Sequence, residues 1–476
     1  MVMEWSSLVM YLQDDNSKMI VGLTLGAGLL AYYLLEAVKR PVLACRDGLW
    51  RGFLESRLGI LQERYWPTPW CYEARCQTIL ASVLRARLPD VPYIREVVEL
   101  KDGGLVSLDW LVADADNNTI GKHIGKKQGN ETTDCNINNK KQETNDQTKT
   151  GVRSGEQEEE KKKEEEERCE DGAQTQTKNI VVVLPGLTGS SQSEYVKGLV
   201  LTLQQEGLTC VVLNNRGIGG VRLVTTRTYC AANSDDLEEA LDHLGHTHTN
   251  AALFIIGISL GGMITGNYLA TRERKAAGRV VAAAVVSAPW NMVDGLKGME
   301  RPGLNLLLNW YLASCLCELV ESLSYRLAGR NHKWDLDYVK KSRTMREFDT
   351  RFTAHQFGFV DAEDYYRASS LHTRFNRISV PLLCLHAADD PFQPVPVLPT
   401  EAAEKSSHVA MVVTARGGHI GFMDGVIPRL VYYSDRLLAQ LVVAVFSNPK
   451  LMARVKEEAE TYRSTLVSEE VLETSM

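Results

Sequence analysis

A serine, an acid and a histidine follow one another along the chain, each directly after an apolar run. Ser259 lies in Gly257-Ile-Ser-Leu-Gly261, after the apolar residues 251–256. The G-x-S-x-G spacing is typical of a nucleophile elbow, where a serine occupies a strained turn between a strand and a helix. Glycine is needed on both sides because the neighbouring backbone comes too close for a Cβ atom. The pattern predicts that Ser259 is a nucleophile, and the alternative is that it only caps the following helix.

A serine hydroxyl becomes a good nucleophile only when an oriented base takes its proton. His419, in Gly418-His-Ile-Gly421, is the one of the ten histidines in a glycine-flanked loop after a terminal strand-like run. Two aspartates compete for the role of the acid. Asp390 precedes Pro391 at a spacing that is common for the acid loop, so we favour it, and we expect Asp389 to have a supporting or capping role. The acid would fix the imidazole tautomer without taking the proton.

An acyl-transfer site also needs two amides to stabilise the oxyanion. One is predicted at Leu260, directly after the nucleophile and at the N-terminus of a helix. The other is predicted at Leu187, because Gly186 and Gly189 on either side let the backbone turn inward. The amide of Thr188 is the alternative.

Apolar runs alternate with helical stretches along much of the chain. The expected strands span residues 93–99, 105–111, 180–184, 209–213, 251–256, 280–286, 378–385 and 409–414. Such alternation indicates a parallel sheet with helices on both faces. Lys101-Asp-Gly-Gly104 separates the first two runs and is a hairpin signal. The sequence therefore predicts an α/β fold with a mostly parallel sheet of eight strands.

Residues 290–377 interrupt the alternation and contain helical segments but no convincing strand. They predict a helical cap over the carboxyl ends of the strands. Its apolar first part could line an acyl-chain pocket or form an ordinary core between helices. A final amphipathic helix is expected at 430–446, and the tail beyond Glu457 is expected to be frayed.

Residues 19–35 carry no charge, and Ala37 and Val38 extend the apolar stretch past Glu36. This length suits one uncleaved membrane anchor, with a buried helix or a signal peptide as the alternatives. More basic residues follow the stretch than precede it, which favours a cytosolic catalytic domain. The sequons at Asn117 and Asn130 would need the opposite orientation to be used.

The composition limits the functional class. The chain has 476 residues, 44% of them apolar, and a net charge of −7, which argues against nucleic acid as a partner. Its ten cysteines contain no metal-spaced pair of pairs, so core thiols are expected, and neither a cofactor nor a metal. Residues 115–178 are rich in charged and amide side chains and predict a disordered insertion.

The expected organisation is an N-terminal segment (1–18), an anchor (19–38), a connector (39–92), the first part of the core (93–114 and 179–289), the insertion (115–178), the cap (290–377), the second part of the core (378–446) and a C-terminal tail (447–476).

Several motifs together resemble one branch of the α/β-hydrolases, the branch that contains α/β-hydrolase domain-containing proteins 1 and 3. They are Leu184-Pro-Gly-Leu-Thr-Gly189, Asn214-Asn-Arg-Gly217, Arg227-Thr-Tyr-Cys-Ala-Ala-Asn233, Gly257-Ile-Ser-Leu-Gly-Gly-Met263, Arg346-Glu-Phe-Asp349, Arg351-Phe-Thr353 and Gly417-Gly-His-Ile-Gly-Phe422. The resemblance implies an α/β-hydrolase fold and a single-pass membrane serine hydrolase with the triad Ser259, Asp390 and His419. It further implies a phospholipase acting on phosphatidylcholine with medium-length or oxidatively truncated acyl chains, and a type II topology, which conflicts with the charge count. The charged insertion departs from the family pattern.

The expected function is thus hydrolysis of carboxylic esters of lipids at an endomembrane, through an acyl-enzyme on Ser259. The expected partners are the substrate and the bilayer, and no protein partner is predicted. One alternative is acyl transfer, for which His332-Lys-Trp-Asp-Leu-Asp337 offers a short H-x-x-x-x-D match. The other is a non-enzymatic scaffold that binds through the charged insertion.

Overall fold

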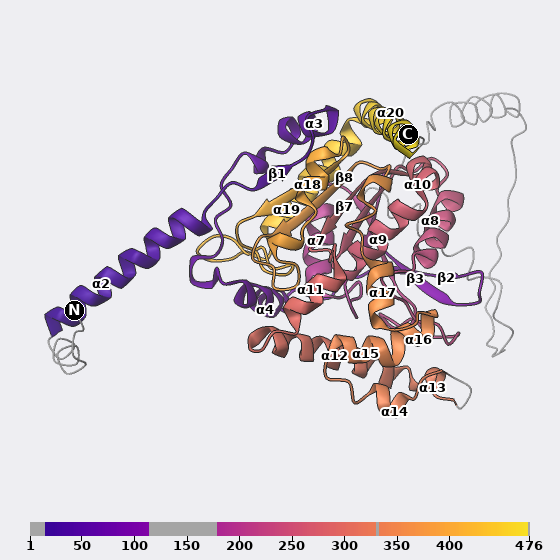
Figure 1. The fold of residues 1–476 in the computed structure, drawn as a ribbon, viewed down its shortest axis with the longest axis horizontal. Helices are drawn as coiled ribbons and strands as arrows, with labels where there is room; N and C mark the ends of the chain where they lie inside the picture. Colours follow the sequence, from indigo (N-terminus) through magenta and orange to yellow (C-terminus); the bar gives the residue numbers. More distant parts are fainter. Residues whose placement is uncertain (1–14, 114–178, 330–332, 475–476) are drawn as a thin grey trace, which may run out of the picture.

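A computed structural model describes residues 15–113, 179–329 and 333–474 of the chain. The charged insertion, the two sequons, most of the N-terminal segment and His332 lie outside the described residues, so the expectations for them stay predictions. The described part forms a mixed sheet with helices on both faces and a helical layer at one end (Figure 1). The α/β fold class expected from the sequence is confirmed.

The sheet has the order β1-β9-β8-β7-β6-β4-β5-β3-β2. Its strands are β1 (Val42–Ala44), β2 (Ile94–Glu99), β3 (Leu105–Leu111), β4 (Ile180–Leu184), β5 (Thr209–Asn214), β6 (Leu253–Ile258), β7 (Val280–Val286), β8 (Leu382–Ala387) and β9 (Val409–Thr414). The run from β5 through β4, β6, β7 and β8 to β9 is parallel. The hairpin of β2 and β3 adds antiparallel to β5, as its turn signal indicated.

The sheet contains nine strands, so the expected number of eight is wrong. The additional strand, β1, comes from the segment expected to be a connector and pairs antiparallel with β9, with Val42 opposite Val413. A strand of three residues is too short to give a periodic pattern, and it forms because the open edge of β9 offers unpaired backbone groups.

Alternate residues of the central strands face two separate cores. Val181 and Val183 pack with α3 (Leu49–Arg57), α7 (Glu194–Gln205), α19 (Tyr433–Ser447) and α20 (Pro449–Thr474). Ile180 and Val182 pack with α8 (Asp235–Thr247), α9 (Leu260–Thr271), α10 (Glu273–Arg279) and α18 (Thr400–Lys405). Because both faces are covered, the central strands are apolar throughout, as parallel strands require.

The tail differs from the expectation of fraying beyond Glu457. It continues as α20 to Thr474, and Ala459, beyond Glu457, is buried, as are Met452 and Val455 earlier in the same helix. Their spacing of three and four residues places them on one helix face, and this burial holds the helix on the domain.

The cap covers the end of the sheet where the parallel strands finish (Figure 1). It contains α11 (Met292–Met299), α12 (Leu304–Ser322), α13 (Ser324–Leu327), α14 (Leu336–Val339), α15 (Met345–Phe348), a π-helical turn (Asp349–Thr353), α16 (Ala354–Phe357) and α17 (Ala362–Ser369). No strand occurs among the described residues of the cap.

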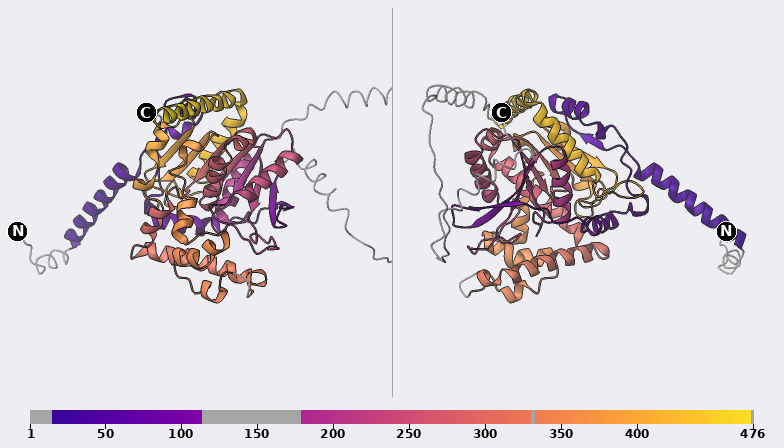
Figure 2. Two further views of the ribbon diagram at one scale, coloured as in Figure 1. Left: turned by 45° about the vertical axis from the view of Figure 1, so that its right-hand side comes forward. Right: turned by 180° about the vertical axis from the view of Figure 1, so that it is seen from behind.

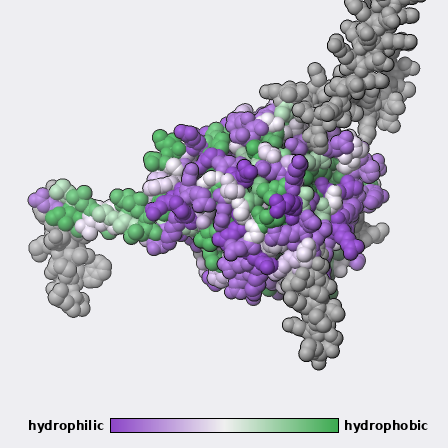
Figure 3. Space-filling model, turned by 90° about the horizontal axis from the view of Figure 1, so that it is seen from above, coloured by the Kyte–Doolittle hydropathy of each residue, from purple (hydrophilic) through white to green (hydrophobic). Residues whose placement is uncertain are grey.

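The N-terminal apolar segment forms α2 (Asp15–Tyr32) followed by a π-helical turn (Tyr33–Ala37). Among the described residues, the stretch Lys18–Ala37 is the one unbroken helix that is long and apolar enough to cross a membrane, and 6% of it is buried. Helices α11 and α12 would meet the same test only as a pair, and they are bent by 112°. The segment extends away from the domain (Figure 2), and its surface is apolar beside the mainly hydrophilic domain (Figure 3).

Candidate active site

Ser259 lies on the turn between β6 and α9, with φ of 51° and ψ of −114°. A Cβ atom on Gly257 would lie 2.5 Å from the carbonyl oxygen of Gly261, and one on Gly261 would lie 2.3 Å from that of Leu184. No side chain fits at either position without moving the backbone. The structure therefore has the strained strand-to-helix turn that the G-x-S-x-G spacing predicts.

Ser259, His419 and Asp390 form one hydrogen-bonded chain, although they come from three different loops. The hydroxyl oxygen of Ser259 lies 2.9 Å from Nε2 of His419. Nδ1 of the same ring lies 2.9 Å from Oδ2 of Asp390. The other oxygen of Asp390 accepts the N–H of Phe392 at 2.8 Å, which fixes the carboxylate. The chain has the donor and acceptor order of a nucleophile, a base and an orienting acid.

Asp389 has a different environment from its neighbour. Its Oδ1 accepts the backbone N–H of Gly418 at 2.9 Å, beside the histidine rather than on the ring. Burial raises its pKa from the ordinary 3.8 to about 6, because the charged form loses hydration. The structure thus separates the two aspartates: Asp390 contacts the imidazole, and Asp389 supports the backbone of the histidine loop.

Leu187 and Thr188, the two candidates for the second oxyanion amide, lie in the loop after β4. The N–H of Gly186 donates to the hydroxyl of Tyr195 at 2.8 Å, and the N–H of Thr188 donates to the hydroxyl of Tyr229 at 3.0 Å. Both neighbours of Leu187 are therefore engaged, which removes Thr188 as the alternative donor in this conformation. Leu187 and Leu260 line the same cavity as Ser259.

Backbone strain gathers around this site. The non-glycine residues with positive φ in the described part of the chain are Thr188, Ser259, Ser287, Ile420 and Phe422. They lie in the loops that follow β4, β6, β7 and β9. Such conformations cost about 1–3 kcal/mol each and concentrate where the chain must present particular groups.

The histidine loop is supported by α4 (Ala74–Arg85), which the sequence analysis did not connect with the site. The N–H of His419 donates to Oγ1 of Thr78 at 2.9 Å. The N–H of Met423 donates to Oε1 of Gln77 at 3.1 Å. The buried positions of α4 are Ala74, Gln77, Ala81 and Arg85, so polar residues occupy two of its inward sites.

An apolar cavity of about 100 Å³ begins at Ser259 and His419 and is bounded by methionines and leucines of α9, α11 and α12. A second cavity of about 60 Å³ lies beneath α12 and shares with it Leu187, Leu260, Met292 and Met345. The cap therefore leaves apolar space next to the serine while its inward leucines also form a helix-helix core.

A larger pocket of about 560 Å³ lies on the cap between Lys333 and His355. It is lined by many charged and hydroxyl side chains and contains none of the predicted site residues. Its size alone does not indicate a reaction, and neither Ser259 nor His419 lines it.

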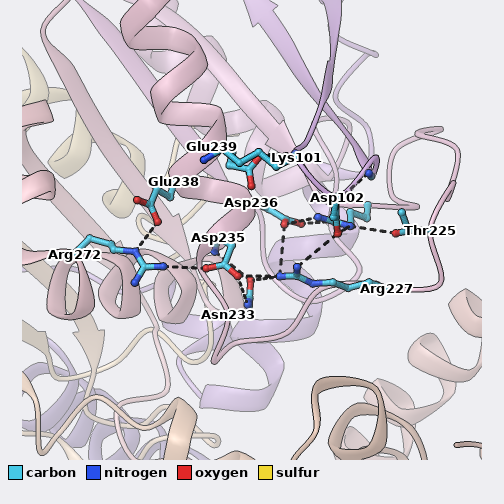
Figure 4. Close-up of polar contacts among 12 residues, drawn as sticks. Lys101, Asp102, Thr225, Arg227, Asn233, Asp235, Asp236, Glu238, Glu239 and Arg272 are labelled. Atoms are coloured by element: carbon cyan, nitrogen blue, oxygen red, sulfur yellow. Dashed lines mark hydrogen bonds and ion pairs between the residues drawn. The ribbon is translucent and has the colours of Figure 1, made fainter.

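The motifs Asn214-Asn-Arg-Gly217 and 227–233 mainly stabilise the scaffold. Arg216 is buried and donates to Asp236 at 2.7 and 2.8 Å and to Asp102 of the β2–β3 turn at 2.6 Å. Arg227 donates to Asn233 at 2.7 Å, within the network that Figure 4 shows. These pairs hold the hairpin turn on α8, and removing one partner would leave a buried charge uncompensated.

No group of three histidine, cysteine, aspartate or glutamate side chains could hold a metal ion in the part of the chain that the structure describes.

The sheet, the elbow and the hydrogen-bonded chain define the class of serine hydrolases with the α/β-hydrolase fold. A family model described as serine aminopeptidase, S33, matches residues 175–419. The chain is 34% identical over 446 residues to phospholipase ABHD3 of Mus musculus, covering 92% of this chain and 94% of that protein. The phospholipases ABHD3 of Homo sapiens and Bos taurus are 34% and 33% identical, over 87% and 88% of this chain and 87% of each relative.

This chain therefore belongs to the α/β-hydrolase family, and it is an ester hydrolase. The resemblance inferred from the motifs is confirmed.

The raised pKa of Asp389 predicts that the free energy of unfolding depends on pH. The folded state holds the proton more tightly than the unfolded state, so the free energy of unfolding falls as the pH rises from about 4 to about 6. Asp389→Asn cannot ionise and keeps an acceptor for the amide of Gly418. We expect it to raise the free energy of unfolding at pH 7 by on the order of 1–3 kcal/mol and to have a much smaller effect at pH 4.

Urea unfolding of the full chain in detergent at both pH values measures this difference. Asp389→Ala is the matched control, because it also removes the charge but loses the acceptor, and it should be less stable than Asp389→Asn. If Asp389→Asn were less stable than the wild type at pH 7, the explanation by buried charge would be wrong.

Proposed function

We propose that the chain hydrolyses acyl esters of phospholipids, with Ser259 as nucleophile, His419 as general base and Asp390 as the acid that orients the ring. The observation that carries this proposal is the hydrogen-bonded chain from Ser259 through His419 to Asp390 at the mouth of an apolar cavity.

In the first half of the reaction, Oγ of Ser259 attacks the ester carbonyl carbon while Nε2 of His419 takes the hydroxyl proton. The carboxylate of Asp390 stabilises the imidazolium without accepting that proton. When the tetrahedral intermediate collapses, His419 gives the proton to the leaving alcohol and the acyl group remains on Ser259. In the second half, His419 takes a proton from water as the water oxygen attacks the acyl carbon. When this second tetrahedral intermediate collapses, His419 returns the proton to Oγ of Ser259 and the fatty acid leaves.

The amides of Leu260 and Leu187 are proposed to bind the oxyanion. Leu260 begins α9, so its N–H lies at the positive end of a helix dipole. Leu187 is held between two residues whose amides donate to tyrosine hydroxyls. Donors fixed in this way need little rearrangement during the reaction, and each contributes about 3 kcal/mol of transition-state stabilisation.

The substrate class follows from the cavity and from the relatives. The space beside Ser259 is apolar and suits an acyl chain. Relatives that match this chain over most of its length are named phospholipases. The two cavities are small, which favours acyl chains of medium or truncated length. Together with the resemblance to the family, this leads us to propose phosphatidylcholine with medium-length or oxidatively truncated chains as the substrate. We further propose that α2 crosses a membrane and keeps the catalytic domain beside its substrate.

A fluorophosphonate probe tests the nucleophile. The probe should label the wild-type chain and fail to label Ser259→Ala and His419→Ala, with ester turnover at least about a thousandfold lower in both. Ser56→Ala, on the surface of α3, is the control and should be labelled like the wild type. Labelling that persisted in Ser259→Ala would end the assignment.

Thr78 is predicted to position the histidine loop. Thr78→Val keeps the shape of the side chain but removes the acceptor for the N–H of His419, so kcat should fall about five- to tenfold with little change in KM. Thr78→Ser keeps the hydroxyl and should restore most of kcat. Steady-state hydrolysis of a soluble ester gives both constants, and a wild-type kcat in Thr78→Val would refute the role.

The second cavity predicts a limit on acyl-chain length. Leu316 on α12 lines it, so Leu316→Ala should enlarge it and shift the preferred phosphatidylcholine toward longer chains. The assay compares kcat/KM over a series of chain lengths in mixed micelles. Leu203→Ala, in the core between α7 and the sheet, controls for lost stability and should leave the preference unchanged. An unchanged preference in Leu316→Ala would show that this cavity does not hold the chain.

A further inference from the structure

The outer face of α12 is as apolar as its inner face. Leu304, Leu307 and Tyr311 follow one stripe of the helix and are 57%, 61% and 60% exposed, with Trp310 beside them. Residues 304–313 include no charged side chain. A helix on the surface of a globular protein normally presents charged and polar residues to water. The exposed face of this helix is therefore suited to an apolar environment.

The neighbouring helix α4 has the same property. Ile79 and Val83 are exposed four residues apart, and its two charged side chains are Arg75 at the start and the buried Arg85. Nε of Arg75 donates to Oδ1 of Asn305 at 2.9 Å, which joins α4 to the beginning of α12. The exposed apolar faces of α4 and α12 thus belong to one surface.

A loop after the histidine completes this surface. Val426 and Ile427 are 70% and 84% exposed. The indole N–H of Trp70 donates to the carbonyl of Val426 at 2.7 Å, and Trp66 precedes it in the connector. Trp66, Trp70 and Trp310 are the tryptophans that are exposed among the described residues. Tryptophan is enriched at the interface between a membrane and water.

The surface adjoins the end of α2. The hydroxyl of Tyr33 donates to the carbonyl of Pro67 at 2.6 Å, and the ring of Tyr72 contacts those of Tyr32 and Tyr33. In the views of Figures 1 and 2, α4 and the beginning of α12 lie on the side of the domain from which α2 leaves. A bilayer that contained α2 would lie next to this side.

We propose that the exposed apolar side chains of α4, of residues 304–311 and of residues 424–430, here called the docking surface, insert into the interface of the membrane that α2 crosses. The proposal rests on the proposed function, in which α2 spans that membrane. A lipid surface fits better than a protein partner because the helix faces are uncharged, bear interfacial tryptophans and continue directly from the anchor.

Docking would connect the bilayer with the active site. Leu312 lies on α12 one turn after Leu308 and lines the cavity that reaches Ser259. The same helix thus has one face on the docking surface and another on the catalytic cavity. An acyl chain could pass from the membrane along α12 with little exposure to water, which lowers the cost of extracting the lipid.

Fluorescence tests the contact without catalysis. The full chain carrying Ser259→Ala is placed in bilayers of phosphatidylcholine with or without brominated acyl chains, which quench nearby tryptophans. Adding Trp310→Phe should remove a measurable share of the quenching, whereas Trp334→Phe, the same change elsewhere in the cap, should not. Equal quenching with and without Trp310 would overturn the proposal.

Kinetic measurements test whether docking helps lipid reach the active site. Leu304→Ser together with Leu307→Ser should raise KM for phosphatidylcholine in bilayers by about tenfold and leave hydrolysis of a soluble short ester within about twofold. Val97→Ser with Val360→Ser, two exposed sites outside the docking surface, is the control and should change neither rate. Unchanged bilayer kinetics in the first variant would overturn the proposal.

Two outcomes would distinguish a failure of the proposed function from a failure of the docking proposal. If the wild type did not hydrolyse the soluble ester, the proposed function would fail, while the quenching of Trp310 would still decide the docking. If Leu307→Cys formed a disulfide between two copies and Trp310 were not quenched, a second copy of the chain would cover this face and the docking proposal would be wrong.

Discussion

The catalytic edge of the sheet depends on the close approach of Gly261 to the end of β4. A Cβ atom there would lie 2.3 Å from the carbonyl oxygen of Leu184, so the first turn of α9 can contact the neighbouring strand only through bare backbone. This contact holds Ser259 at a positive φ, which is costly on its own. The surrounding core can bear that cost because the strands on both sides are buried and apolar. The packing of the buried strands on both sides, rather than the turn alone, therefore sets the position of the Ser259 hydroxyl.

The chain before the hairpin is part of the active-site scaffold rather than a passive link. Tyr33 bonds to Pro67, Tyr65 bonds to the carbonyl of Met423, and Thr78 accepts the amide of His419. These contacts lead from the apolar N-terminal helix to the loop that holds the base. A displacement of that helix relative to the domain would therefore strain the same loop. The arrangement gives a physical reason why the connector packs tightly against residues 418–426.

The sequence could predict the site's loops because their requirements are local. Glycines beside Ser259 and His419 and apolar runs before each loop can be recognised within a few residues. Spacing favours Asp390 over Asp389 as the acid. Coordinates are needed to decide between them, since adjacent side chains at a strand end point in different directions. The support by α4 could not be inferred, because it depends on hydrogen bonds that join Thr78 and Gln77 to a loop that lies far along the chain. Strand β1 was missed because the edge of β9 determines it more than its own three residues do.

The composition of helix α12 does not reveal which environment each of its faces contacts. An apolar helix in a sequence is compatible with a protein core, an acyl pocket or a membrane surface, since all three exclude water. The coordinates separate these environments by face: Leu316 and Val320 pack inward, Leu312 borders the cavity of Ser259, and Leu307 is exposed. Burial accounts for the first two faces within the domain. The exposed leucine face costs free energy in water, and it becomes favourable only if the environment outside the domain is itself apolar.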